Sequence, residues 1–143
     1  MPLDPEDPRS IASAAGEVAA ATPGVQLLVL FGSAASGRLR PESDVDVGWQ
    51  GDPPPGGEAA LLAALERRLG REVHLVDLRL ASELLRIEVV RAGLVAFERA
   101  PGRWTTFAAE SMSRWADIEP LVRRCAEAVR LRALEGASGS HHG

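Results

Sequence analysis

Apolar residues recur every three or four positions in four segments of the chain, which is the spacing of a helix with one buried face. These segments are residues 8–21, 58–70, 81–93 and 101–134. We expect Ser82 to cap the third helix at its N-terminus and Pro120 to bend the last one. The pattern therefore predicts four helices separated by shorter segments.

Four of the shorter segments have the apolar or alternating pattern of strands. They are residues 25–31, 43–49, 71–78 and 94–98. The first is an almost wholly apolar run, typical of a buried strand, whereas the second alternates acids with valines. Because helices and strands alternate along the chain, we predict an α/β (α+β) fold in which helices flank a mixed four-stranded sheet.

The length and composition of the chain indicate a single soluble domain. The chain has 143 residues, of which 45% are apolar and 25% charged, as in ordinary globular domains. We expect one domain over residues 1–135, with its core at 8–100 and a helical segment at 101–134, followed by a disordered tail at 136–143.

Charge, cysteine content and hydropathy limit where the protein acts and what it binds. The net charge of −4 argues against general binding of nucleic acid. The single cysteine, Cys125, excludes an internal disulfide and fits a reducing compartment. We expect it to be a packing residue of the last predicted helix, where it lies between Val122 and Val129. No apolar run approaches the ~20 residues that cross a membrane, and the acidic, proline-rich start is not a signal peptide. We therefore expect a cytoplasmic protein that neither enters a membrane nor binds nucleic acid directly.

Two aspartates, Asp44 and Asp46, flank one valine on the second predicted strand. Successive side chains of a strand point to opposite faces, so these carboxylates project together while Val45 and Val47 pack on the other side. Neighbouring carboxylates repel each other unless a cation lies between them, and Mg²⁺ binds carboxylate and phosphate oxygens. A strand with two exposed acids has the same pattern, so the pair alone does not identify a metal site.

Gly32 and Ser33 end the first predicted strand, ten residues before the Asp-x-Asp pair. Glycine allows a phosphate to approach the backbone, and the free N–H groups at the start of a helix attract anions. A simple turn at the end of a strand would contain the same residues. In combination with Asp44 and Asp46, however, they predict a phosphate site next to a metal site.

A third acid, Asp77, lies near the end of the third predicted strand. If this strand lies beside the second, Asp77 can join Asp44 and Asp46, and three carboxylates around two metal ions suit phosphoryl or nucleotidyl transfer. The alternative is an acid that caps the following turn. His74 is expected on the opposite face of the same strand, as a core or edge histidine and not as a ligand.

The stretch FGSAASGRLRPESDVDVGW, followed later by VHLVDL, resembles the minimal nucleotidyltransferases (MNT) of the DNA polymerase β superfamily. The resemblance covers residues 25–100 and includes LLRIEVVRAGLVAFE, which is similar to the helix and strand that follow in the family. It implies a nucleotidyltransferase fold and ATP as substrate, with nucleotide phosphates held by Gly32 and Ser33. It further implies two Mg²⁺ ions bound by Asp44, Asp46 and Asp77.

The chain departs from the family pattern directly after the Gly-Ser pair. Many members carry arginines there, whereas this chain has Ala35 and Ser36, and its arginines come later at Arg38 and Arg40. We expect these two arginines to reach the triphosphate. The alternative is that they lie in a solvated loop.

The resemblance also implies a biological role. Family members of this size are often antitoxins that are paired with a helical HEPN-type toxin, to which they transfer AMP on a tyrosine hydroxyl. Two alternatives stay open, namely a binding module that neutralises its partner by occlusion and a nucleotidyltransferase that acts on a small molecule. The last segment is too short for the substrate domain of the relatives that modify aminoglycosides.

Aromatic and apolar residues of the last segment are expected to belong to the core, and any that are exposed are candidate anchors for a partner protein. They are Trp104, Phe107, Trp115 and Leu121.

Overall fold

The computed structural model describes residues 2–139, in which five helices alternate with four strands. The helices are α1 (Pro8–Ala20), α2 (Gly32–Ser36), α3 (Gly57–Leu69), α4 (Glu83–Ala92) and α5 (Arg103–Gly139). The strands are β1 (Val25–Phe31), β2 (Val45–Gly51), β3 (Val73–Asp77) and β4 (Leu94–Glu98). The structure confirms the four helices and four strands expected from the sequence and adds the short helix α2.

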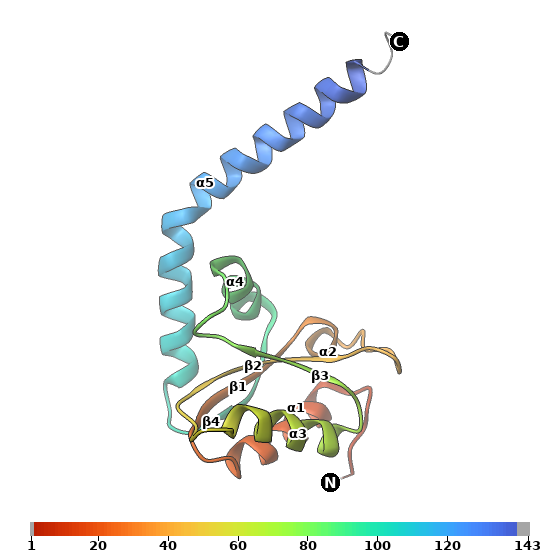
Figure 1. The fold of residues 1–143 in the computed structure, drawn as a ribbon, viewed down its shortest axis with the longest axis vertical. Helices are drawn as coiled ribbons and strands as arrows, with labels where there is room; N and C mark the ends of the chain where they lie inside the picture. Colours follow the sequence, from red (N-terminus) through yellow and green to blue (C-terminus); the bar gives the residue numbers. More distant parts are fainter. Residues whose placement is uncertain (1, 140–143) are drawn as a thin grey trace.

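The four strands form one mixed sheet in the order β3-β2-β1-β4. Strand β1 is antiparallel to β2 and to β4, whereas β2 and β3 are parallel. The predicted mixed, four-stranded α+β architecture is therefore confirmed (Figure 1). Strand β3 lies at one edge of the sheet, and only β2 pairs with it among the described strands.

Helices cover both faces of the sheet. On one face, α1 and α3 pack against residues such as Leu28 and Leu30, and on the other face Val89 of α4 and Phe107 of α5 pack against Leu27 and its neighbours. Side chains of β1 alternate between these two apolar clusters, which explains why its sequence is continuously apolar. The central strand therefore fixes the positions of the helices on both sides.

The predicted boundaries agree with the observed ones to within one or two residues for most elements. Ser82 caps α4 as expected, since its Oγ accepts a hydrogen bond of 3.1 Å from the backbone N–H of Leu85. Strand β2 begins at Val45 and not at residue 43, so Asp44 lies just before the strand. None of the helices in the described part of the chain is long and apolar enough to span a membrane.

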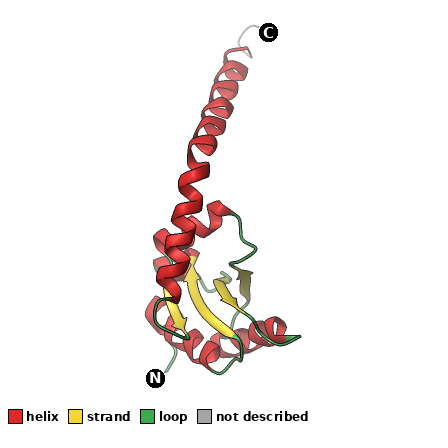
Figure 2. Cartoon of the chain, turned by 90° about the vertical axis from the view of Figure 1, so that its left-hand side faces the viewer, coloured by secondary structure: helices red, strands yellow, loops and turns green. Residues whose placement is uncertain are grey.

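Helix α5 leaves the body of the domain and extends away from it (Figures 1 and 2). It bends part of the way along, and Pro120 lies within it, where a proline removes one backbone hydrogen bond and crowds the preceding turn (Figure 1). The helix continues to Gly139, beyond the expected end at residue 134, so part of the expected disordered tail is helical. Residues 140–143 of that tail lie outside the described residues.

Only the first part of α5 belongs to the core. Phe107 is buried and Trp104 and Trp115 are half-buried, whereas Leu121 is exposed, so the expectation that all four are core residues is wrong for Leu121. Cys125 is also exposed, in contrast to the expected packing, because α5 has left the sheet before it reaches this residue. The distal half of the helix thus presents apolar side chains that no other part of residues 2–139 covers.

Candidate functional site

The turn between β1 and α2 brings Gly32 against Asp46. Phe31 is paired with Asp46 in the β1–β2 register, so the residue that follows Phe31 lies beside the aspartate. Gly32 has a φ of +64°, and a Cβ atom at this position would lie 2.5 Å from Oδ2 of Asp46. Both the backbone conformation and the space require glycine here. The structure therefore brings together two motifs that are ten residues apart in sequence.

His74 is the neighbour of Asp46 on the other side. The two residues are paired in the parallel register of β2 and β3, and Nδ1 of His74 lies 3.1 Å from Oδ1 of Asp46. The His74 side chain is 63% exposed and that of Asp46 is 30% exposed. His74 is thus an edge-strand histidine, as expected, but it is bound directly to a predicted site residue.

The alternation predicted around the Asp-x-Asp pair is confirmed on its apolar side. Val45 and Val47 are fully buried, while Asp46 is half-buried and Asp44 is exposed in the segment before β2. Among residues 2–139, no three His, Cys, Asp or Glu side chains gather closely enough to hold a metal ion on their own. Among these residues, no third carboxylate therefore forms such a group with Asp44 and Asp46.

Asp77 does not lie beside Asp44 and Asp46. The parallel register pairs it with Trp49, and a residue three positions further along a strand lies about 10 Å away and on the opposite face. Its carboxylate is paired with Arg79, with Nη2 and Oδ2 at 3.1 Å, and it accepts a hydrogen bond of 2.9 Å from the backbone N–H of the same arginine. Hydrogen bonding and charge from Asp77 raise the pKa of the Arg79 guanidinium above its ordinary value. These contacts fit the alternative role in which Asp77 caps the following turn.

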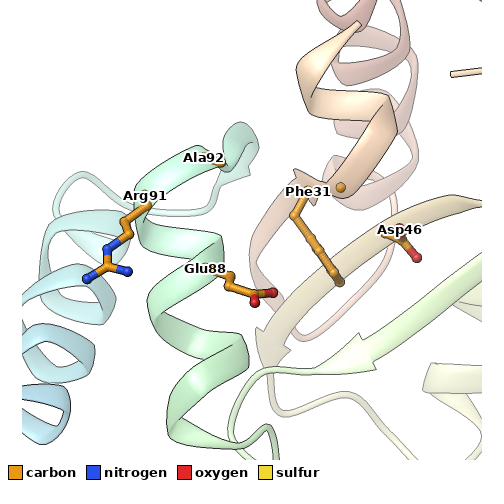
Figure 3. Close-up of a pocket in the computed structure, with 6 residues that line it drawn as sticks. Phe31, Asp46, Glu88, Arg91 and Ala92 are labelled. Carbon is orange, nitrogen blue, oxygen red and sulfur yellow. The ribbon is translucent and has the colours of Figure 1, made fainter. Parts of the chain in front are cut away.

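A cavity of about 420 Å³ opens where the sheet faces α4 (Figure 3), a size typical of small-molecule sites. It is lined by Phe31, Gly32 and Asp46 from the sheet side and by Glu88, Arg91 and Ala92 from α4. In Figure 3 the carboxylate of Glu88 extends toward Phe31, whereas Arg91 points toward α5, where its guanidinium carbon lies 5.8 Å from the centre of the Trp115 ring. The sequence analysis did not identify Glu88 as a site residue. Its position on the polar side of an amphipathic helix indicates that its side chain is accessible to a ligand.

The two predicted phosphate-binding arginines lie outside this cavity. Arg38 and Arg40 are exposed in the segment between α2 and β2, and neither is among the residues that line the cavity. The segment itself is held in place, because the backbone carbonyl of Arg40 accepts a hydrogen bond of 3.0 Å from Nη1 of Arg71. Gly32 lines the cavity, and Ser33 is half-buried at the start of α2.

A buried arginine, Arg86, fixes the helix that forms the far wall of the cavity. Its Nε donates to Oγ of Ser111 at 3.0 Å, its Nη1 donates to the carbonyl of Leu78 at 3.1 Å, and its guanidinium carbon lies 4.7 Å from the centre of the Phe107 ring. Burial lowers the pKa of this guanidinium, although arginine stays charged at any ordinary pH. One side chain thus joins α4 to α5 and to the end of β3.

More than half of the chain matches a known protein family. A family model described as "Polymerase beta, Nucleotidyltransferase" matches residues 15–101, which contain the whole sheet and the cavity. A search of curated proteins finds no match.

Several solved structures have the same fold. A toxin–antitoxin structure with AMP-PNP superposes with a TM-score of 0.70 at 25% identity and covers 82% of this chain and 97% of that chain. A complex of the tri-AMPylated Shewanella oneidensis HEPN toxin with an MNT antitoxin superposes with a TM-score of 0.66 at 22% identity, covering 85% of this chain and 98% of that chain. The toxin–antitoxin pair MntA–HepT gives a TM-score of 0.64 at 23% identity and covers 83% of this chain and 96% of that chain.

Proposed function

This chain belongs to the polymerase β nucleotidyltransferase family, and we propose that it is an antitoxin that transfers AMP from ATP to a tyrosine hydroxyl of a HEPN-type toxin. The observation that carries the proposal is the contact between Gly32 and Asp46, which joins the Gly-Ser and Asp-x-Asp motifs into one site that opens into a cavity. The solved structures of the same fold that were compared include toxin–antitoxin complexes, one with AMP-PNP and one with an AMPylated toxin.

The residues at this site suit a divalent cation. Mg²⁺ is usually held by one or two carboxylates together with substrate phosphates and water, so it does not need a ready-made cluster of three protein ligands. Asp44 and Asp46 would supply the carboxylates. When bound, the ion would neutralise charge on the phosphates and polarise the phosphorus that is attacked.

The charges of the side chains that line the cavity also favour a divalent cation at this site. Asp46 and Glu88 both line it, and Arg91, the cationic residue in its lining, points toward α5 (Figure 3). A triphosphate would meet mainly negative side chains and be repelled unless a cation entered with it. We therefore propose that the nucleotide binds as a metal complex.

Gly32 and Ser33 would hold the phosphates. The absence of a side chain at Gly32 leaves the backbone open, and the first N–H groups of a helix have no acceptor within the helix. Arg38 and Arg40 would approach the triphosphate from the adjacent exposed segment, where their long side chains are free to reorient.

In the proposed reaction, the hydroxyl oxygen of the acceptor attacks the α-phosphorus of ATP. A new oxygen–phosphorus bond forms, the bond between the α-phosphorus and the bridging oxygen breaks, and pyrophosphate leaves with the electron pair. The proton of the acceptor hydroxyl passes to a base at the site or to solvent. The chain holds the two reactants in line, which is the main contribution of protein side chains to such transfers.

Occlusion of the partner without transfer is the second candidate function. It is favoured by one observation, namely that Asp77 lies away from Asp44 and Asp46, so the described site has two carboxylates and not three. A binding module of this kind would protect against a toxin by covering its active surface.

Co-expression with a HEPN-type toxin that this chain neutralises separates the two functions. If the protein acts by transfer, the double substitution Asp44→Asn/Asp46→Asn abolishes rescue of growth. It removes both negative charges and leaves side chains of nearly the same size. If it acts by occlusion, the double variant rescues growth as well as the original chain does, and the transfer proposal is wrong. The amounts of soluble original chain and soluble double variant, measured in parallel, must be equal.

A further inference from the structure

The sheet brings an imidazole, and not a third carboxylate, to the predicted metal site. Because β2 and β3 are parallel and pair residue 46 with residue 74, the side chain of β3 that shares a face and a level with Asp46 is that of His74. Its Nδ1 atom lies 3.1 Å from Oδ1 of Asp46. The acid of the same strand, Asp77, is on the opposite face and is held by Arg79.

We propose that His74 is a metal ligand of this site and takes the place of a third carboxylate; the inference rests on the proposed function. Two donor atoms that bind one octahedral ion at ~2.1 Å and at a right angle are about 3.0 Å apart. The 3.1 Å between Nδ1 of His74 and Oδ1 of Asp46 matches this separation. A cation can therefore take the place of this contact without a large movement of either side chain.

The environment of His74 agrees with this role. The side chain is 63% exposed on an edge strand, so it does not serve the core, and among the described contacts its ring nitrogen is paired with Asp46. Imidazole is a common ligand of divalent metals in its neutral form, through either nitrogen. Asp46 is the residue between it and the glycine turn, so metal, phosphate and imidazole would meet at one place.

An imidazole in the ligand set changes which metal the site prefers. The pair of Asp46 and neutral His74 supplies one negative charge, whereas a pair of aspartates at these two positions would supply two. Nitrogen ligands favour first-row transition metals over Mg²⁺, which prefers oxygen. We therefore expect the site to bind Mn²⁺ and Co²⁺ more tightly relative to Mg²⁺ than a site with aspartate at position 74 would.

Pulsed electron paramagnetic resonance of bound Mn²⁺ tests the proposal without reference to activity. The full chain is loaded with Mn²⁺ and a non-hydrolysable ATP analogue, and echo modulation from a directly coordinated ¹⁴N nucleus is measured. We expect this signal in the original chain and its loss in His74→Ala, while Mn²⁺ stays bound through the aspartates. The adenine nitrogens and His141 and His142 are present in both proteins and cannot account for a difference.

A second variant tests the metal preference. In His74→Asp the ¹⁴N signal is lost, and the concentration of Mg²⁺ that displaces half of the Mn²⁺ falls by on the order of 10-fold, in line with the cost of altering a metal's ligand environment. Circular dichroism shows whether each variant is folded, which we expect because the side chain is largely exposed.

Two results would overturn the inference, and they differ in what they leave standing. Mn²⁺ that binds to the original chain without ¹⁴N coordination removes His74 from the ligand set but leaves the proposed transfer intact. Mn²⁺ that binds no better to the original chain than to Asp44→Asn/Asp46→Asn removes the metal site, and the proposed function fails with it.

Discussion

Gly32 is the residue on which the proposed site depends most directly. Its backbone is in the left-handed region, with φ at +64°. A Cβ atom at this position would also lie only 2.5 Å from Oδ2 of Asp46, so the carboxylate leaves no space for a side chain. The sequence identified this glycine as a place where phosphate could approach. What it could not show is that the same glycine also makes room for the carboxylate of Asp46.

Replacing Gly32 with alanine separates these two effects when it is compared with Gly37→Ala. Both glycines have positive φ, so each alanine costs about 1–2 kcal/mol of backbone strain, but a Cβ at Gly37 would meet only Pro8, at 3.8 Å. We expect a similar fall in melting temperature for both variants, of several degrees. AMP transfer should fall by at least 10-fold in Gly32→Ala alone, because only this variant displaces the Asp46 carboxylate. Equal transfer by both variants would show that the contact with Asp46 has no functional role.

At the scale of elements, the pairing of β2 with β3 decides which residues form the site. The spacing of apolar and polar residues was sufficient to predict four strands, four of the helices and the side of β2 that carries Asp46. It was not sufficient to place Asp77, because sequence spacing does not give the register between two strands whose paired residues, such as Asp46 and His74, are 28 positions apart. A shift of one residue in that register moves every side chain to the other face, and the observed register selects His74.

Other differences at this scale come from contacts distant in sequence. In the sequence, Arg86 has the position of a polar residue on an amphipathic helix. In the structure it is 2% exposed and donates hydrogen bonds to Ser111 of α5 and to the carbonyl of Leu78, which follows β3. Cys125 reads as a packing residue, but the helix that carries it extends past the sheet. Periodicity shows which face of a helix is apolar; it does not show whether a neighbour covers that face.

Removal of the Arg86 side chain tests whether it joins α4 to the rest of the domain. In Arg86→Ala the hydroxyl of Ser111 and the carbonyl of Leu78 lose their donor, and the contact with the Phe107 ring is lost. We expect the free energy of unfolding in urea to fall by about 2–4 kcal/mol. Arg67→Ala, at an exposed position of α3, is the control and should change it by less than about 0.5 kcal/mol. A loss as small as that for Arg86→Ala would contradict the structural role.

At the scale of the whole molecule, the chain consists of a compact sheet domain and a helix that extends away from it (Figure 1). The distal part of α5 exposes five large apolar side chains, namely Leu121, Val122, Val129, Leu131 and Leu134. The superposition with the AMP-PNP structure includes 97% of that chain but 82% of this one. This chain therefore has residues without a counterpart in that structure. We propose that the toxin packs against this distal surface of α5.

A charge placed on the distal surface of α5 should weaken the complex and leave the chain itself unchanged. Val129 is 65% exposed, so Val129→Glu removes no internal contact, and we expect an unchanged melting temperature for the chain alone. Its affinity for the toxin, measured by calorimetry, should fall by at least 10-fold because a charge would be buried in an apolar contact. Leu80→Glu is the matched control, since Leu80 is 85% exposed but lies in the sheet domain. Equal affinities of the two variants would mean that the toxin binds elsewhere.

The central claim is that Gly32, Asp44 and Asp46 form one site that transfers AMP to a protein. We would first measure the intact mass of a HEPN-type toxin that this chain neutralises, after incubation with this chain, ATP and Mg²⁺ or Mn²⁺. We expect one or more AMP-sized increments on the toxin, which are absent with the Asp44→Asn/Asp46→Asn variant. An unmodified toxin that nevertheless forms a stable complex with both proteins would contradict it, and the chain would then be an antitoxin that acts by binding alone.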